Sequence, residues 1–198
     1  MDCLDDPDDR RNAAGGKSLT RENLVNMKIL VTYWSQTGNT KKVAEAIFQA
    51  LTCDREIRPF DSVDSLNGTD LVFIGFPIMQ FGPPAAARKL VNELAEGKRI
   101  ALFVTHAMPS QSDDPLQKAM LEKELQKCRA LCAKTEFLGL YHCQGELSEK
   151  TAGELISSGI PMLASFAEMR TRTIGHPDQT ELAEAGMFAR SITETLKG

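Results

Sequence analysis

The chain has 198 residues, of which 42% are hydrophobic and 25% are charged. This length suits one domain of ordinary size and is short for two. Its 23 basic and 27 acidic side chains give a formal charge of −4, which excludes the strongly basic surface that holds nucleic-acid phosphates. The five cysteines are odd in number and form no C-x-x-C pair, so their spacing indicates neither a closed disulfide framework nor a zinc finger.

The first 26 residues are rich in Asp, Arg, Asn, Gly and Ser and contain few large aliphatic side chains. Because they can bury little apolar surface to offset the entropy of ordering, we expect residues 1–26 to form a disordered or loosely attached tail. They lack the basic and apolar regions of a signal peptide, and the apolar runs elsewhere are far shorter than the roughly 18 residues that span a bilayer. These features predict a cytoplasmic protein without a membrane span.

From Met27 onward, short apolar runs alternate with stretches of helical periodicity, as in parallel strands joined by helices. The predicted strands are residues 28–34, 55–60, 71–76, 99–105 and 136–141. Helices are predicted after Thr40, from Pro83, from near Pro115 and from about Thr180, the last with the spacing of a capping box at Asp178 and Glu181. Residues 27–198 are therefore predicted to form a three-layer α/β domain with a doubly wound, five-stranded parallel sheet that binds its ligand at the carboxyl ends of the strands.

The loop after the first predicted strand has the composition of a phosphate site. Its residues are Ser35, Gln36, Thr37, Gly38, Asn39 and Thr40. The backbone N–H groups at the start of a helix favour an anion, and three hydroxyls and one amide add donors. Since the loop has no lysine and neither of the glycine patterns of nucleoside triphosphate or dinucleotide loops, a single terminal phosphate fits it best. The alternative is a simple helix cap, for which one hydroxyl would suffice.

The sequence from Lys28 to Thr40 resembles the opening of flavodoxins, in which a Ser/Thr-x-Thr-Gly-Asn-Thr loop binds the phosphate of FMN. The order of predicted elements resembles a flavodoxin across residues 27–198, and residues 71–75, 98–105 and 175–190 resemble a flavodoxin-like subgroup of bacterial proteins. The resemblance implies a flavodoxin-like sheet of strand order 2-1-3-4-5 and FMN as the cofactor.

In flavodoxins the loops after the third and fourth strands clamp the flavin ring, usually with one aromatic side chain each. The resemblance therefore implies that Phe81 stacks on the ring, and that His106 and Met108 stand in place of the usual tyrosine of the second loop. Ordinary core packing is the alternative for Phe81 and Met108. The residues implied to contact the ring are Pro77, Ile78, Met79, Gln80, Phe81 and Gly82 in the first loop, and Thr105, His106, Ala107 and Met108 in the second.

His106 is the one residue of these loops with an ordinary pKa near neutrality, so it is a candidate for relaying a proton to the flavin or a substrate. The alternative is a histidine that packs or forms hydrogen bonds, because no neighbour in the sequence completes a catalytic dyad. His142 and His176 are weaker candidates. No other catalytic side chain and no metal site is predicted.

About 35 residues separate the last predicted strand from the last predicted helix, which is long for a compact domain. We expect this apolar segment, residues 143–177, to form one or two short helices beside the flavin that shape a docking surface or a substrate pocket; a flap that completes the core is the alternative.

Two candidate functions follow from these expectations. The first is an FMN-binding flavodoxin-like redox protein that carries electrons to or from a partner enzyme, either a reductase or an acceptor. The second is an FMN-dependent oxidoreductase that acts directly on a quinone, a tetrapyrrole or a similar conjugated small molecule.

Overall fold

The computed structural model describes residues 27–108 and 114–196, so the predicted tail at residues 1–26 lies outside the described residues. Five strands form one parallel sheet in the order β2-β1-β3-β4-β5, which confirms the predicted topology. The strands are β1 (Lys28–Tyr33), β2 (Asp54–Pro59), β3 (Leu71–Pro77), β4 (Arg99–His106) and β5 (Glu136–Gln144).

The position of each strand in the sheet follows from its side chains. The inner strands β1, β3 and β4 are buried along almost their whole length, as expected for uninterrupted apolar runs covered on both faces. β2 is charged and largely exposed, which suits an edge strand. β5 continues three residues past its predicted end because the buried Gln144 finds partners: its N–H donates to the Glu181 carboxylate over 2.9 Å, and its side-chain amide donates to the Arg172 carbonyl over 3.0 Å.

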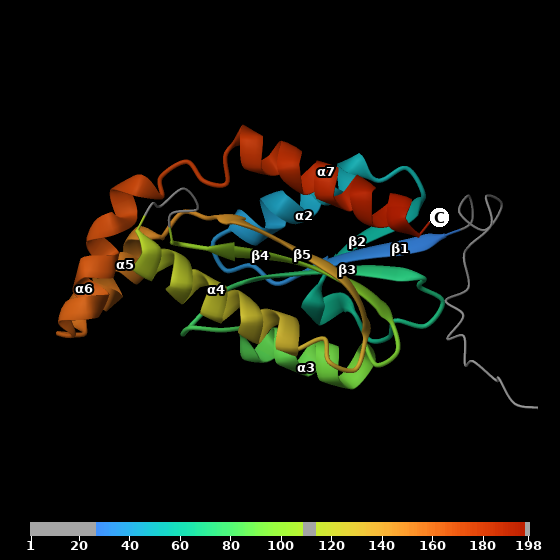
Figure 1. The fold of residues 1–198 in the computed structure, drawn as a ribbon, viewed down its shortest axis with the longest axis horizontal. Coiled ribbons are helices and arrows are strands. Elements are labelled where there is room, and N and C mark those ends of the chain that lie inside the picture. Colours follow the sequence, from blue (N-terminus) through green and yellow to red (C-terminus); the bar gives the residue numbers. More distant parts are fainter. Residues whose placement is uncertain (1–26, 109–113, 197–198) are drawn as a thin grey trace, which may run out of the picture.

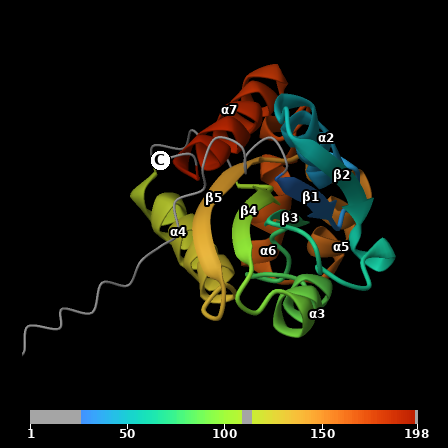
Figure 2. The same ribbon diagram turned by 90° about the vertical axis from the view of Figure 1, so that its right-hand side faces the viewer.

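Helices cover both faces of the sheet and bury one apolar cluster on each (Figures 1 and 2). On one face lie α2 (Asn39–Ala50) and α7 (Gln179–Thr195), and on the other lie α3 (Ala85–Leu94) and α4 (Pro115–Ala130). The α2 and α7 helices pack closely at Gly186, where a Cβ would lie 3.1 Å from the Cβ of Ala50. Between β2 and β3 there is only the short 3-10 helix η1 (Phe60–Ser62), in agreement with the short connection in the sequence.

The helix starts show how far local sequence determines structure. The α7 helix begins with the predicted capping box: Asp178 accepts from the Glu181 N–H over 2.9 Å, and the Glu181 carboxylate accepts from the Asp178 N–H over 2.8 Å. The α4 helix begins at Pro115, as predicted. The α3 helix begins at Ala85 with Pro84 as its N-cap residue, so the helix starts after the prolines at which it was predicted to begin.

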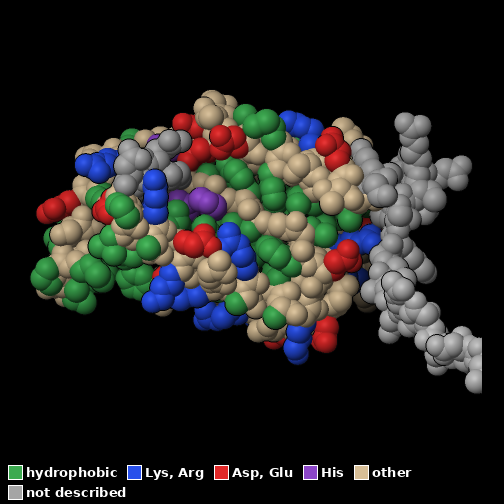
Figure 3. Space-filling model, in the orientation of Figure 1, with side chains coloured by type: hydrophobic (Ala, Val, Ile, Leu, Met, Phe, Trp, Pro, Cys, Tyr) green, Lys and Arg blue, Asp and Glu red, His purple; other side chains and the backbone are tan. Residues whose placement is uncertain are grey.

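The chain between β5 and α7 forms α5 (Glu149–Ser157), α6 (Pro161–Glu168) and the 3-10 helix η2 (Met169–Arg172). Figure 1 shows α5 and α6 beyond the carboxyl ends of the strands. They pack on the body through a small apolar cluster of Leu147, Ala152 and Ala167. Around the turn between them, Ile156, Ile160 and Met162 remain exposed, and we call these three residues the hairpin tip. Hydrophobic side chains gather at this end of the molecule in Figure 3.

Within residues 27–108 and 114–196, no helix has both the length and the apolar character needed to cross a membrane.

Candidate functional site

The loops that follow β1, β3, β4 and β5 meet at the carboxyl edge of the sheet, where hydrogen bonds join them. The hydroxyls of Thr40 and Thr105 lie 2.9 Å apart and connect the phosphate loop, residues 35–40, to the end of β4. Ile78 donates its N–H to the Thr105 carbonyl over 2.8 Å, and Gly145 donates to the His106 carbonyl over 2.8 Å. The structure therefore brings the predicted phosphate loop and both predicted ring loops together.

The phosphate loop presents unpaired backbone amides. Gly38 has a φ of 91°, in the left-handed region that glycine adopts without strain, and its N–H donates to the Ser35 hydroxyl over 3.0 Å. The N–H groups of Thr37, Asn39 and Thr40 have no acceptor among residues 27–108 and 114–196. These amides stand at the positive end of the α2 dipole, and the loop contains no charged side chain. This arrangement fits a phosphate held by neutral donors.

Two side chains predicted to bind the phosphate are occupied within the protein. The Asn39 amide donates to the Glu146 carbonyl over 2.9 Å, and the Thr40 hydroxyl is buried against Thr105. Gly145 packs directly on Asn39, since a Cβ at Gly145 would lie 3.0 Å from the Asn39 Nδ2. The side chains of Asn39 and Thr40 thus stabilise the loop by hydrogen bonds to the rest of the protein.

The other side chains of the loop are accessible. Gln36 and Thr37 are exposed, and Ser35 is half-buried. The Ser35 hydroxyl accepts from Gly38 and keeps its own proton for a further hydrogen bond. The backbone amides and the hydroxyls of Ser35 and Thr37 are therefore the donors that remain for a phosphate.

The first predicted ring loop forms a tight two-residue turn, and we call residues 79–82 the ring hairpin. Met79 and Gly82 exchange both backbone hydrogen bonds, over 2.9 and 3.0 Å, and Gln80 and Phe81 adopt positive φ angles of 47° and 63°. Such angles are uncommon away from glycine. The Lys127 ammonium of α4 donates to the Phe81 carbonyl over 2.6 Å, while the Phe81 side chain is 49% exposed. Phe81 is thus free to contact another molecule, and stacking on the flavin stays a prediction.

A groove of about 740 Å³ runs between the ring hairpin, α3 and α4. Trp34, which follows β1, and Phe81 supply aromatic surface, and Arg88, Lys127 and Lys134 supply positive charge. The described residues that line the groove include none from the phosphate loop and none from the 143–177 segment. The groove therefore borders the ring hairpin on the side of α3 and α4.

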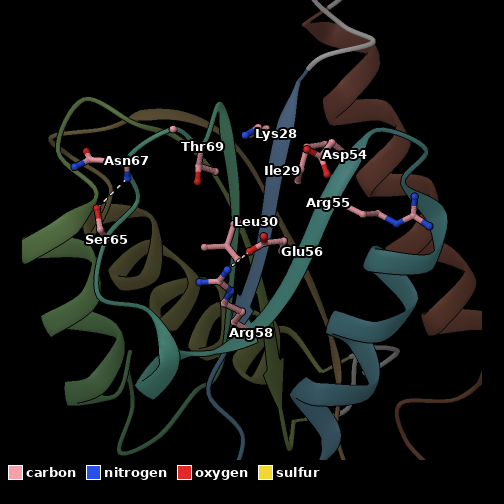
Figure 4. A pocket seen from close by; sticks show the side chains of 11 residues that line it. Lys28, Ile29, Leu30, Asp54, Arg55, Glu56, Arg58, Ser65, Asn67 and Thr69 are labelled. Atoms are coloured by element: carbon pink, nitrogen blue, oxygen red, sulfur yellow. Dashed lines mark hydrogen bonds and ion pairs between the residues drawn. The ribbon is translucent and has the colours of Figure 1, made fainter.

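A second hollow, of about 230 Å³, lies at the opposite end of the sheet (Figure 4). It is lined by the first residues of β1 and β2, including Lys28 and Asp54, and by the loop before β3. Glu56 and Arg58 form an ion pair within it. Because ligands of doubly wound sheets bind at the carboxyl ends of the strands, this hollow is not part of the candidate site.

The second predicted ring loop is held by His106, which is 4% exposed. Its Nδ1 lies 2.9 Å from the Met108 carbonyl, and its Nε2 lies 3.0 Å from the Nδ1 of His142. Burial and the neighbouring His142 lower the pKa of His106 to about 3, although the Met108 carbonyl acts in the opposite direction. Because both ring nitrogens are engaged, the geometry favours the hydrogen-bonding role over proton relay.

Three residues outside the three predicted loops support the carboxyl ends of the strands, and His142 among them was predicted only as a weaker candidate for proton relay. His142 pairs with His106, Glu146 accepts from Asn39 through its carbonyl, and the Glu181 carboxylate accepts from the N–H of Gln144. Only Glu181 carried a signal in the sequence, the capping-box spacing. The partners of His142 and Glu146 lie 36 and 107 residues away, so no local pattern points to them.

Residues 30–190 match the family model described as a flavodoxin domain. The chain belongs to the flavodoxin family. Among curated relatives of this flavodoxin, the flavodoxin-like domain-containing protein BilS from Clostridioides difficile (strain CD3) is 30% identical over 176 residues, which cover 84% of this chain and 96% of that protein.

Two solved structures share the fold of this flavodoxin. A flavodoxin from the domain Archaea has a TM-score of 0.53 at 19% identity and covers 87% of this chain and 100% of its own. A WrbA-like flavodoxin from Agrobacterium tumefaciens has a TM-score of 0.53 at 15% identity, with coverages of 87% and 98%.

The cofactor of the flavodoxin family is FMN, and the unpaired amides of Thr37, Asn39 and Thr40 fit its phosphate. This chain is accordingly an FMN-binding redox protein of the flavodoxin type.

Proposed function

We propose that this protein is an electron carrier that exchanges electrons with a partner enzyme, a reductase or an acceptor, at the carboxyl edge of its sheet. The observation that carries the proposal is the phosphate loop, whose free amides stand beside both ring loops. Bound FMN supplies the redox chemistry, and the protein supplies binding, orientation and shielding from water. A carrier needs no catalytic side chain.

In this proposal each loop has one task. The amides of the phosphate loop and the hydroxyls of Ser35 and Thr37 hold the FMN phosphate. Residues 77–82 and 105–108 border the two sides of the ring. The hydrogen bond from Ile78 to Thr105 fixes the spacing between these two loops, because it joins the start of the first loop directly to the first residue of the second.

The hairpin tip supports a protein partner. Its residues Ile156, Ile160 and Met162 are 55%, 50% and 59% exposed, and the stretch from 155 to 167 contains no charged residue. Exposed apolar surface of this kind marks contact sites between proteins. Since α5 and α6 lie beyond the carboxyl ends of the strands, the tip stands at the same end of the molecule as the phosphate loop (Figure 1).

A cytoplasmic location belongs to the same proposal. The four cysteines that the structure describes, Cys53, Cys128, Cys132 and Cys143, are all free thiols. Unpaired thiols in this number suit a reducing compartment, where partner reductases of this kind would also act.

One observation favours the second candidate function, direct oxidation or reduction of a conjugated small molecule. The groove beside the ring hairpin has the volume of a typical ligand site, and its aromatic and basic lining suits a planar anion such as a tetrapyrrole carboxylate. A quinone would use the aromatic surface alone. In either case the substrate would meet the flavin at the ring hairpin.

The two functions are separated by reducing the purified protein. We expect a yellow protein, or a colourless one that takes up added FMN, which NAD(P)H alone reduces slowly and which NAD(P)H with a flavodoxin reductase reduces rapidly. Direct reduction by NAD(P)H with turnover of a quinone or tetrapyrrole would favour the enzyme. Failure to bind FMN under any condition would refute both functions.

A pair of glycine variants tests the phosphate loop itself. Gly38 and Gly68 both have positive φ angles and both have open space where a Cβ would stand. The strain of an alanine is therefore similar at the two sites, but only Gly38 lies in the phosphate loop. G38A should weaken FMN binding at least about tenfold while G68A leaves it unchanged, because only the first displaces the amides that hold the phosphate. Equal losses in the two variants would contradict this assignment.

A further inference from the structure

Two histidines from neighbouring strands form a pair beneath the loop that follows β4. His106 ends β4 and His142 lies on β5; their ring centroids are 5.2 Å apart and their planes are tilted by 40°. The Nε2 of His106 lies 3.0 Å from the Nδ1 of His142, within hydrogen-bond distance. His106 is buried and His142 is half-buried, so the pair runs from the buried end of β4 towards the surface of the protein.

The partners allow one arrangement of protons on the neutral pair. The Met108 carbonyl can only accept, so the Nδ1 of His106 carries a proton and donates to it. The Nε2 of a neutral His106 is then an acceptor, which requires a donor at the Nδ1 of His142. His142 therefore keeps its Nε2 unprotonated. The hydrogen bonds run in one direction, from His142 to His106 to Met108.

The surroundings keep this pair neutral. Burial lowers the pKa of His142, Arg129 of α4 lowers it further, and Glu122 of α4 acts in the opposite direction. Glu122 and Arg129 are themselves paired over 2.8 Å, which reduces the effect of each on the imidazole. The proton order described above is therefore the one expected at neutral pH.

We propose that His142 is a positioning residue for the second ring loop: it fixes the tautomer of His106, and His106 holds the Met108 carbonyl and so the course of residues 105–108. His142 acts through His106, without contact to the cofactor. The same loop is joined to its neighbours on both sides, since the His106 carbonyl accepts from Gly145 and the Thr105 carbonyl accepts from Ile78. The effect on FMN rests on the proposed function, whereas the hydrogen-bond order does not.

The first test reads the protons directly, on the full chain without FMN. Long-range ¹H–¹⁵N NMR of ¹⁵N-histidine-labelled protein should show His106 and His142 both protonated at Nδ1 and unprotonated at Nε2 at pH 7.5. His176 provides a reference in the same spectrum, because its Nδ1 lies 2.6 Å from a Glu181 carboxylate oxygen. A proton on the Nε2 of His106 would overturn the proposal.

The second test measures the consequence for the cofactor with two substitutions of His142. Asparagine places an amide nitrogen where Nδ1 stands and keeps a donor, whereas phenylalanine keeps a ring and removes the donor. We expect H142F to weaken FMN binding about five- to tenfold, the usual effect of one lost neutral hydrogen bond, and H142N to stay within about twofold of the wild type. Wild-type affinity in H142F, or equal losses in both variants, would overturn the positioning role.

Substitutions of His106 provide a second measurement if H142F does not fold. In H106N an amide nitrogen takes the place of Nδ1 and can still donate to Met108, whereas H106Q places its amide at the position of Nε2. H106N should therefore retain tighter FMN binding than H106Q, and the reverse order would contradict the proposal. A wild-type protein that binds no FMN would refute the proposed function and the role toward FMN together, while the NMR spectrum would still decide the hydrogen-bond order.

Discussion

Asn39 and Gly145 show how the phosphate loop depends on a residue that is remote in the sequence. The Asn39 side chain reaches the carbonyl of Glu146, and it can do so because the neighbouring Gly145 has no side chain. Backbone and amide are in van der Waals contact, with no space for a methyl group. The geometry of the backbone amides that face the phosphate thus depends on the contacts of Asn39 with Gly145 and Glu146.

A methyl group at Gly145 should therefore weaken cofactor binding. In G145A the new Cβ would lie 3.0 Å from the Asn39 Nδ2, so Asn39 must move and the start of α2 with it. We expect a loss of about tenfold or more in FMN affinity, measured by quenching of flavin fluorescence on titration. G153A is the matched control: Gly153 is exposed within α5 with nothing near its Cβ position, so alanine there should leave FMN affinity unchanged and stabilise the helix by about 0.5–1 kcal/mol.

Because of the lowered pKa of His106, the free energy of unfolding depends on pH. Its pKa is about 3 in the folded chain and 6.5 when unperturbed, so between these values the unfolded chain binds a proton that the folded chain does not. The free energy of unfolding should consequently fall as the pH drops from about 6.5 towards 3, by at most about 1.4 kcal/mol per pH unit for this one group. His142, with its lowered pKa and with Glu122 and Arg129 facing it from α4, acts in the same direction.

Urea unfolding at pH 7.5, 6.0 and 5.0 measures this dependence. H106N lacks the titrating imidazole, so its stability should decline less steeply than that of the wild type over this range. Equal slopes for the two proteins would show that His106 titrates normally in the folded chain.

At the scale of secondary structure elements, Glu181 joins three parts of the fold. Its carboxylate accepts from the N–H of Gln144 in β5, from the N–H of Asp178 before α7, and from the Nδ1 of His176. Its own carbonyl accepts from the Tyr141 hydroxyl over 2.6 Å. The end of β5 and the start of α7 are thereby fixed to each other, and with them the segment that carries α5 and α6.

Removal of the Glu181 carboxylate should destabilise the fold. E181A would leave the buried N–H of Gln144 without its acceptor and would abolish the capping box, which together should lower the free energy of unfolding by about 2–4 kcal/mol. E184A, at an exposed position one turn further along α7, should change it by less than about 0.5 kcal/mol. Urea unfolding of both variants at pH 7.5 makes the comparison, and similar values would contradict the joining role of Glu181.

The elements themselves were predictable where their determinants are local. Apolar runs located β1, β3 and β4 because a strand buried on both faces must be apolar throughout. The capping box was visible because its partners are three residues apart. The last residues of β5 were missed because the buried Gln144 depends on Glu181, which lies 37 residues away in the sequence. For the same reason, the bracing roles of Asn39 and Thr40 could not be distinguished from phosphate binding until their partners were known.

At the scale of the whole molecule, the distribution of charge is more informative than its sum. Six acidic and four basic residues fall within residues 1–26, so residues 27–198 carry only half of the net charge of −4. Residues 27–198 are thus nearly balanced in charge, and the hairpin tip is uncharged. Recognition of a partner at this end should therefore depend on apolar contact and shape, with little long-range electrostatic steering.

We therefore expect the rate of electron transfer to depend little on salt concentration and to depend on the side chains of the hairpin tip. The rate of reduction by a partner reductase should change less than about threefold between 50 and 500 mM NaCl, a range over which steered pairs slow strongly. M162S should slow the reaction because it removes apolar contact at the tip. M187S is the matched control, since Met187 is 54% exposed on α7, away from the tip, against 59% for Met162. A steep salt dependence, or equal rates in the two variants, would exclude docking at the tip.

The bond between Asn39 and Glu146 also bears on how the protein is made. The phosphate loop belongs to the first strand-loop-helix unit and leaves the ribosome early, but the carbonyl that braces it lies 107 residues further along the chain. A nascent chain that ends before Glu146 has the loop without this hydrogen-bond acceptor. Cofactor capture is therefore expected late in synthesis, after the end of β5 has emerged, so newly made chains that stall before this point would accumulate as apoprotein.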